Sequence, residues 1–458
     1  MAAVVLAMPA ATRAEPVPPN VLMIWVDDLR PELGHAGVSG MVTPSLDRLA
    51  ARSVAFERAY CNIPVCGASR ASVMTGLRGT PERFTGYLSR ADADAPGVPA
   101  MNDWLRDAGY YTVSIGKVLH VKEDHADGWD ESLNRPNSGK YFSEENVQLV
   151  KKRSKAGKRG APWERVVEDE NEIADVRVAN AACEAIKRLA GGEKPFFIAA
   201  GFYKPHLPFV APARFWEPYP VDQVRLPANF ATRPDAPDVA FAKWGELRAY
   251  HRIPAKGSVS EATARELIAS YRACVSFTDS QVGRLLDTLD ASGAAGNTVV
   301  VLLGDHGWNL GEHGMWCKHC VFETSMRTPL LVSAPMMEGF RAGGSTATLT
   351  EFVDVLPTVC ELIGLRAPPQ AVGTSCVPVL SDPAHRHRDA AIGRYGLGDT
   401  IRTDRYRYSV FRRKDQELGH MLYDHDADPA EDTNLVDDPA MADVVADLSR
   451  RLAEATGR

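Results

Sequence analysis

The chain has 458 residues, of which 45% are hydrophobic and 24% charged, as is typical of globular proteins. Its formal net charge of -7 provides no general basic surface, so we expect no nucleic-acid partner. No apolar run reaches the length of a bilayer-spanning helix, so we expect no membrane partner either.

Residues 1–19 precede the first predicted strand and contain a short apolar segment followed by a small-residue site from Ala11 to Ala14. This pattern resembles the end of a secretory signal peptide, although the usual positively charged start is missing. The alternative is a disordered, alanine-rich tail. We favour export, which predicts a periplasmic or secreted protein.

From residue 20 onward, predicted strands and helices alternate. The apolar run Asn20–Val26 predicts a buried strand, and Leu46, Leu49 and Val54 then lie at helical spacing behind a Thr43 cap. Further strands are predicted at 111–115 and within EKPFFIAAGF, NTVVVLLGD and RTPLLVSAP, with helices between them. This alternation predicts an α/β fold with a large, mostly parallel mixed sheet covered by helices on both faces.

The pattern changes after about residue 370. The segments AAIGRYG, DTIRTDRYRYSVFRR and HMLYDHD predict short antiparallel strands, and a helix follows from about Asp438. We therefore divide the chain into a leader and linker over 1–19, a main α/β domain over 20–372 and a smaller C-terminal α+β subdomain over 373–458.

Four polar clusters follow predicted strands. In a doubly wound sheet the carboxyl ends of the strands converge on one crevice. Three carboxylates meeting there would repel one another unless a divalent cation lay among them. Each cluster alone also fits an ordinary turn or helix cap, and only their joint placement favours a site. The clusters are Asp27 with Asp28, Lys117 with His120, Lys204 with His206, and Asp305 with His306.

The stretch CNIPVCGASRASVMTG places Cys66 ahead of several hydroxyl residues and Arg70. A helix starting at Ser69 would direct its N-terminal N–H groups toward an anion, and Arg70 would add a planar guanidinium. Together with a metal and two lysines, this suggests transfer of a sulfuryl or phosphoryl group. The eight cysteines form no disulfide framework, and Cys317 and Cys320 lack the second pair that a structural zinc site needs.

These motifs resemble the type I, formylglycine-dependent sulfatases of the alkaline phosphatase superfamily. CGASRASVMTG is similar to the sulfatase signature. NVLMIWVDDLRPELG, IGKVLH, GFYKPHLPF and GDHGWNLGEHGMWCKHCVFETSMRTPL look like the matching segments of the iduronate-2-sulfatase branch and its bacterial relatives, in the same order. The resemblance covers nearly the whole chain and implies an alkaline phosphatase-like fold. It also implies hydrolysis of sulfate esters on a sulfated carbohydrate, such as a 2-O-sulfated uronic acid or a related glycan.

The resemblance also implies a nucleophile and a metal site. A formylglycine-generating or sulfatase-maturating enzyme would oxidise Cys66 to formylglycine, whose hydrate attacks sulfur with one hydroxyl and releases sulfate with the other. Ala68 replaces the commoner proline of the signature, and His306 stands where many sulfatases have Asn. Ca²⁺ is the expected metal, and Mg²⁺ or Mn²⁺ stay open because imidazole is an unusual calcium ligand. The implied metal ligands are Asp27, Asp28, modified Cys66, Asp305 and His306.

Further roles follow from the same resemblance. Arg70 and Lys117 would stabilise the hydrate and the charge that develops during transfer, and His120 would accept the proton in the release step. His206 and Lys318 would contact sulfate and help to protonate the leaving oxygen. Trp308 would form a wall of the substrate pocket.

Two other functions stay open. One is a phosphodiester or phosphonate monoester hydrolase of the same superfamily, which would use a similar site. The other is a non-catalytic glycan-binding protein with Cys66 left as a thiol. The sequence does not indicate the oligomeric state.

Overall fold

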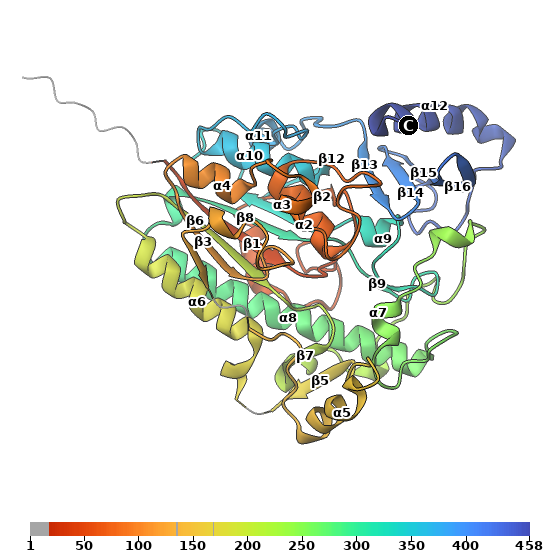
Figure 1. Ribbon diagram of the computed structural model, residues 1–458, viewed down its shortest axis with the longest axis horizontal. Helices are drawn as coiled ribbons and strands as arrows, with labels where there is room; N and C mark the ends of the chain where they lie inside the picture. The colour runs from red at the N-terminus through yellow and green to blue at the C-terminus, as the bar shows by residue number, and fades with distance from the viewer. Residues whose placement is uncertain (1–17, 134–135, 168) are drawn as a thin grey trace, which may run out of the picture.

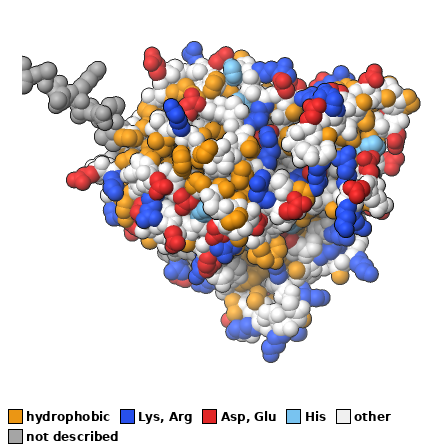
Figure 2. Space-filling view, turned by 45° about the horizontal axis from the view of Figure 1, so that its top comes forward, with side chains coloured by type: hydrophobic (Ala, Val, Ile, Leu, Met, Phe, Trp, Pro, Cys, Tyr) orange, Lys and Arg blue, Asp and Glu red, His pale blue; other side chains and the backbone are white. Residues whose placement is uncertain are grey.

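The computed structural model describes residues 18–133, 136–167 and 169–458. The signal-peptide prediction falls largely on residues 1–17, which lie outside the described residues. In the part that is described, no helix combines the length and apolarity of a bilayer span. Charged side chains of both signs are interspersed over the face drawn in Figure 2, as expected from the modest net charge.

The main element is an eight-stranded mixed sheet (Figure 1). All neighbouring strands are parallel except that β11 runs antiparallel to both of its neighbours, β8 and β2. The predicted fold class, a mostly parallel α/β sheet, is therefore confirmed. The order across the sheet is β12 (Gly344–Glu351), β2 (Val54–Tyr60), β11 (Leu330–Ser333), β8 (Thr298–Gly304), β1 (Asn20–Val26), β6 (Phe196–Phe202), β3 (Tyr111–Gly116) and β4 (Glu131–Leu133).

Helices cover both faces of this sheet because each central strand is apolar on both sides. Leu22 and Ile24 of β1 pack into one buried cluster, whereas Met23 and Trp25 pack into another on the opposite face. The first cluster is closed by α1 (Pro44–Ala50), α6 (Ala174–Leu189) and α8 (Glu261–Ala291). The second is closed by α2 (Cys66–Thr75), α4 (Met101–Asp107), α10 (Val355–Leu362) and α11 (Val377–Ser381).

Shorter elements lie between these layers and at the edges. The helices are α3 (Ala91–Asp94), α5 (Glu144–Ser154), α7 (Gly245–Arg248) and α9 (Glu323–Met326). The small sheets are β5 (Trp163–Val166) with β7 (Phe209–Pro212), and β9 (Asn309–Leu310) with β10 (Trp316–Cys317).

Three local predictions were wrong. The helix predicted from Leu46 and Leu49 ends at Ala50, and Val54 begins β2, where its β-branched side chain packs between neighbouring strands. Thr43 stands at the N-cap of α1, but its hydroxyl donates to the Asp47 carboxylate instead of capping the helix. Helix α2 begins at Cys66, three residues before the predicted start at Ser69.

The predicted C-terminal antiparallel strands and final helix are confirmed. β13 (Ala391–Tyr395), β14 (Gly398–Arg402), β15 (Tyr406–Arg413) and β16 (Gln416–Asp424) form one antiparallel sheet, followed by α12 (Ala442–Thr456). Buried Arg407 joins this sheet to the main one, since it lies 2.5 Å from Glu323 at the start of α9 and 2.7 Å from Glu431. The domain limit near residue 372 stays a prediction.

Candidate active site

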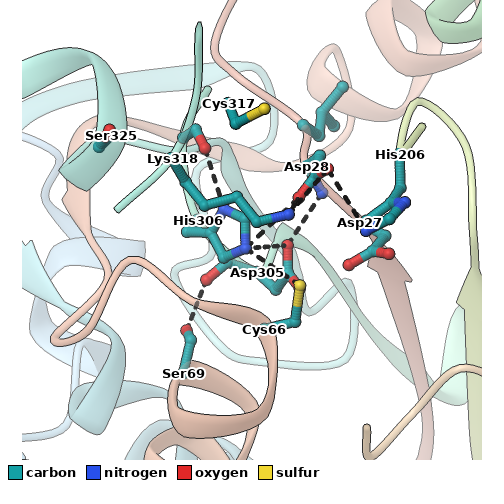
Figure 3. Close-up of polar contacts among 12 residues, drawn as sticks. Asp27, Asp28, Cys66, Ser69, His206, Asp305, His306, Cys317, Lys318 and Ser325 are labelled. Atoms are coloured by element: carbon teal, nitrogen blue, oxygen red, sulfur yellow. Dashed lines mark hydrogen bonds and ion pairs between the residues drawn. The ribbon is translucent and has the colours of Figure 1, made fainter. Parts of the chain in front are cut away.

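The predicted site residues lie close together, and Figure 3 shows Asp27, Asp28, Cys66, His206, Asp305 and His306 among them. Asp27 and Asp28 follow β1, and His206 lies just beyond the neighbouring strand β6. Asp305 and His306 follow β8 on the other side of β1. Cys66, at the first turn of α2, lies against them. The four clusters predicted at strand ends therefore meet at the carboxyl edge of the sheet, with Lys117 arriving from β3.

Three buried carboxylates form the centre of this cluster. Asp27, Asp28 and Asp305 offer oxygen atoms that all lie within 4.8 Å of one another. Asp28 has a positive φ of 62°, a costly conformation for a residue with a Cβ, and its N–H donates to Asp305 Oδ1 at 3.0 Å. Burial raises the pKa of Asp28 against the opposing effect of Lys318, and neighbouring Asp27 adds to the rise.

Two cations neutralise the other two carboxylates. Arg70 is fully buried, and its guanidinium donates to Asp305 Oδ2 at 2.9 Å and to Asp27 Oδ1 at 3.3 Å. Lys117 donates to the other oxygen of Asp27. Burial alone would raise the pKa of Asp27, but Lys117, His206 and Arg70 outweigh it and hold that pKa well below its usual value.

His306 presents a lone pair to the carboxylates. Its Nδ1 lies 2.9 Å from the Gly307 carbonyl oxygen, which can only accept, so the ring proton is on Nδ1. Nε2 then faces Asp28 Oδ1 at 3.4 Å, Asp305 Oδ1 at 3.6 Å and Cys66 Sγ at 3.3 Å. Acceptors that point at one another repel unless a cation lies between them, so this set of donors fits a divalent metal ion.

Cys66 is held tightly at the start of α2. Its side chain is only 2% exposed, and burial raises the pKa of the thiol well above its usual value. The next residue has to be glycine, because a Cβ at Gly67 would lie 2.2 Å from the carbonyl oxygen of Tyr87. Ser69 holds the first turn of α2 against the end of β8, because its hydroxyl donates to the Asp305 carbonyl oxygen at 2.5 Å.

His206 and Lys318 converge on a residue that the sequence did not reveal, Glu246. Its two carboxylate oxygens lie 3.0 Å from His206 Nε2 and 2.9 Å from Lys318 Nζ. Lys318 also donates to Asp28 at 3.0 Å. Glu246 lies on the single-turn helix α7, in a long irregular segment well beyond the end of β7, so neither periodicity nor a strand end marked it.

Both ring nitrogens of His206 face acceptors. Nδ1 lies 2.6 Å from the Leu207 carbonyl oxygen, and Nε2 faces the Glu246 carboxylate. A proton on either nitrogen can be donated to the acceptor that this nitrogen faces, so the ring is positioned for proton transfer. Lys204, predicted in the same cluster, instead supports the turn by donating to the carbonyl oxygens of His206 and Pro208.

The two remaining predicted residues lie at the border of the cluster. His120 is mostly buried, and burial together with Lys117 lowers its pKa to about 3, which leaves the ring neutral. Trp308 is 1% exposed, and Lys318 Nζ lies 4.8 Å from its ring centroid. Trp308 is therefore buried beside Lys318, and its place in a wall of the substrate pocket stays a prediction.

The sheet, with a carboxylate cluster and the start of α2 at its carboxyl edge, has the same fold as solved structures of sulfatases and phosphonate monoester hydrolases. The phosphonate monoester hydrolase of Silicibacter pomeroyi has the same fold, with a TM-score of 0.77, 21% identity and 95% of each chain covered. The structure of BT4656 in complex with its substrate D-glucosamine-2-N,6-O-disulfate gives a TM-score of 0.75 at 23% identity, covering 96% of this chain and 98% of that one.

Sequence comparison identifies the family. Residues 19–365 match the family model described as Sulfatase, and residues 311–457 match the model of the N-sulphoglucosamine sulphohydrolase C-terminal region. Iduronate 2-sulfatase of Mus musculus is 32% identical over 389 residues, which cover 77% of this chain and 70% of that protein. The chain belongs to the sulfatase family and is an enzyme that hydrolyses sulfate esters.

Proposed function

We propose that this sulfatase acts on a sulfated carbohydrate, such as a 2-O-sulfated uronic acid or a related glycan. The nucleophile would be the hydrate of a formylglycine made from Cys66. One observation supports a modified residue 66 as the nucleophile. Cys66 lies against a buried cluster of cations and carboxylates, yet burial raises the pKa of its thiol. A thiol that resists ionisation is a poor nucleophile, whereas an aldehyde hydrate supplies two hydroxyl groups.

The metal belongs to the same proposal. Asp27, Asp28, Asp305 and His306 Nε2 would hold a divalent cation, with residue 66 as a further ligand. When bound, the ion would lower the pKa of a hydroxyl on residue 66 and polarise a sulfate oxygen. Carboxylate oxygens suit Ca²⁺ best, and the imidazole leaves Mg²⁺ and Mn²⁺ as alternatives.

The other side chains would stabilise charge, donate and accept protons, or bind sulfate. Arg70 and Lys117 would stabilise negative charge on residue 66 and on the sulfuryl group. His206, held by Glu246, would give a proton to the alcohol oxygen as the bond between that oxygen and sulfur breaks. Neutral His120 would take the proton of the second hydroxyl, so that the carbonyl re-forms and sulfate leaves. Lys318 would bind a sulfate oxygen.

Mass spectrometry of the peptide that contains residue 66 tests the nucleophile. We expect the mass of the aldehyde in active enzyme, and no turnover by Cys66→Ala. Full activity with an intact thiol would contradict the mechanism. A screen of defined sulfated oligosaccharides then tests the substrate. Carbohydrate binding without turnover, together with a thiol mass, would instead support a non-catalytic glycan-binding protein.

A phosphonate or phosphodiester hydrolase is the second candidate, because the Silicibacter pomeroyi enzyme shares the fold over 95% of this chain. Rates on matched sulfate and phosphate esters separate the two activities. We further propose that the protein is periplasmic or secreted, on the basis of the pattern in residues 1–19 that resembles the end of a signal peptide. Cell fractionation with N-terminal sequencing of the mature protein tests this localisation.

A further inference from the structure

Tyr87 is a large aromatic side chain exposed beside the active site. Its relative exposure is 58%, and its ring meets that of His120 at a centroid distance of 5.8 Å and an angle of 77°. The Tyr87 carbonyl oxygen lies directly over Gly67, the neighbour of Cys66. Within the described residues, nothing hydrogen-bonds to the Tyr87 hydroxyl. Most of the ring and its polar tip therefore remain available at the edge of the site.

The loop that carries Tyr87 is firmly anchored. Phe84 is fully buried, and its N–H donates to Asp94 at 3.1 Å. The N–H of Gly86 donates to Ser89 Oγ at 3.2 Å, and that of Ala91 donates to the buried Asp124 carboxylate at 2.9 Å. A side chain exposed on a fixed loop loses little conformational entropy on binding, so Tyr87 is preorganised for a ligand.

The neighbouring groups indicate which part of the ligand Tyr87 would meet. Cys66, Lys318 and His206 lie around the carboxylate cluster where sulfate is proposed to bind, and the His120 ring that Tyr87 contacts is close enough to Lys117 and Asp27 for their charges to affect it. A sulfate monoester extends outward from this position through its alcohol. A pyranose ring combines an apolar C–H face with hydroxyl groups, which match the apolar face and polar tip of tyrosine.

We infer that Tyr87 forms a ring-binding subsite for the sugar that carries the sulfate. This inference rests on the proposed function, because it requires a sulfated carbohydrate substrate. It explains why a large aromatic ring stays exposed at this place, and it predicts selectivity for cyclic over acyclic alcohols. Tyr87 would contribute to substrate affinity and would take no part in the proton transfers.

The test compares steady-state kinetics on two probes, a 2-O-sulfated uronic acid disaccharide and the acyclic ester choline sulfate. In Tyr87→Ala we expect KM for the disaccharide to rise roughly tenfold, the scale of one lost aromatic contact, with kcat changing less than about twofold. KM for choline sulfate should change much less. Tyr87→Phe keeps the ring and should retain most of the affinity for the disaccharide.

Leu88→Ala is the matched control, since Leu88 is 62% exposed on the same loop. Its KM for the disaccharide should stay near the wild-type value. An equal rise in Leu88→Ala, or equal rises on both probes in Tyr87→Ala, would show a displaced loop and overturn the inference. A Tyr87→Ala variant that binds the disaccharide normally but changes oligomeric state in gel filtration would instead show a surface for a second copy.

Wild-type kinetics separate failure of this inference from failure of the proposed function. Turnover of choline sulfate without turnover of the disaccharide would overturn the ring-binding subsite while leaving the formylglycine mechanism in place. If the wild-type enzyme hydrolyses neither ester, both the proposed substrate class and the ring-binding subsite are refuted.

Discussion

Replacing Arg70 by alanine should affect both turnover and stability. The Arg70 guanidinium is fully buried and donates to two carboxylates, Asp305 and Asp27, and to the carbonyl oxygens of Lys117 and Val118. The variant would leave Asp305 buried without its cation, whereas Asp27 would keep its contact with Lys117. The same side chain therefore neutralises the site and holds α2 against the strand ends.

The size of the stability effect follows from this geometry. Removing one partner of a buried ion pair costs roughly 3–5 kcal/mol of unfolding free energy, because the other charge stays buried without compensation. We expect about 3 kcal/mol, at the lower end, because only one of the two carboxylates loses its cation. With an unfolding entropy of about 2 cal/mol/K per residue, this lowers the Tm of a 458-residue chain by about 3 °C.

The assay measures Tm by circular dichroism and kcat on 4-nitrophenyl sulfate at a temperature where the variant stays folded. We expect kcat to fall by at least about 100-fold, the scale of one lost charge-stabilising donor. Arg388→Ala is the matched control, because Arg388 donates to the buried carboxylate of Asp354 at 2.6 Å outside the active site. It should lower Tm and spare kcat. Near wild-type turnover in Arg70→Ala would refute its catalytic role, and an unchanged Tm would refute the stabilising one.

Four further predictions follow from the structure. Glu246→Gln removes the carboxylate that positions His206, so kcat should fall roughly tenfold or more on sugar sulfates and less on activated aryl sulfates. Equal losses on both kinds of ester would argue against proton donation by His206. Gly67→Ala forces the Cβ against the Tyr87 carbonyl oxygen and should abolish most activity. Gly86→Ala, in the loop that carries Tyr87, has open space and should retain activity in the same assay. Burial lowers the pKa of His120 and of His319 to about 3. Between about pH 6.5 and pH 3, these two histidines therefore bind protons in the unfolded chain but stay neutral in the folded protein. Unfolding free energy should therefore fall as pH drops from about 6.5 toward 3, and His319→Asn should flatten this slope in a series of Tm against pH. Chelation with EDTA should stop turnover and lower Tm by removing the cation from the carboxylates, and re-addition of Ca²⁺, Mg²⁺ or Mn²⁺ singly identifies the metal; full activity after exhaustive chelation would contradict a metal site.

The strand-end residues were predictable because local patterns carry that information. Asp27 and Asp305 each follow an apolar strand, and parallel strands place their carboxyl ends at one edge of a sheet. We could therefore predict that these groups converge without knowing which of them are in contact. Cys66 and Arg70 are four residues apart, so both lie on one side of α2 once the helix is known to begin at Cys66 and not at the predicted Ser69.

Other features depended on packing that no local pattern reports. Val54 continues the helical spacing of Leu46 and Leu49, yet pairing with two neighbouring strands makes it the start of β2. Glu246 enters the site from an irregular segment only because α7 packs beside β10, which leads to Lys318. The burial of Trp308 against that lysine likewise follows from the fold and not from any local pattern.

By itself, the sequence determined the alternation of strands and helices, the edge of the sheet where chemistry occurs and the kinds of side chain present there. These properties depend on neighbours along the chain, which hydrophobic periodicity reports directly. Only the tertiary structure decided which cation meets which carboxylate: Arg70 with Asp305, Lys117 with Asp27 and Lys318 with Asp28. Partners such as Lys318 and Asp28 are 290 residues apart, and a contact of 3.0 Å between them depends on the packing of every layer in between.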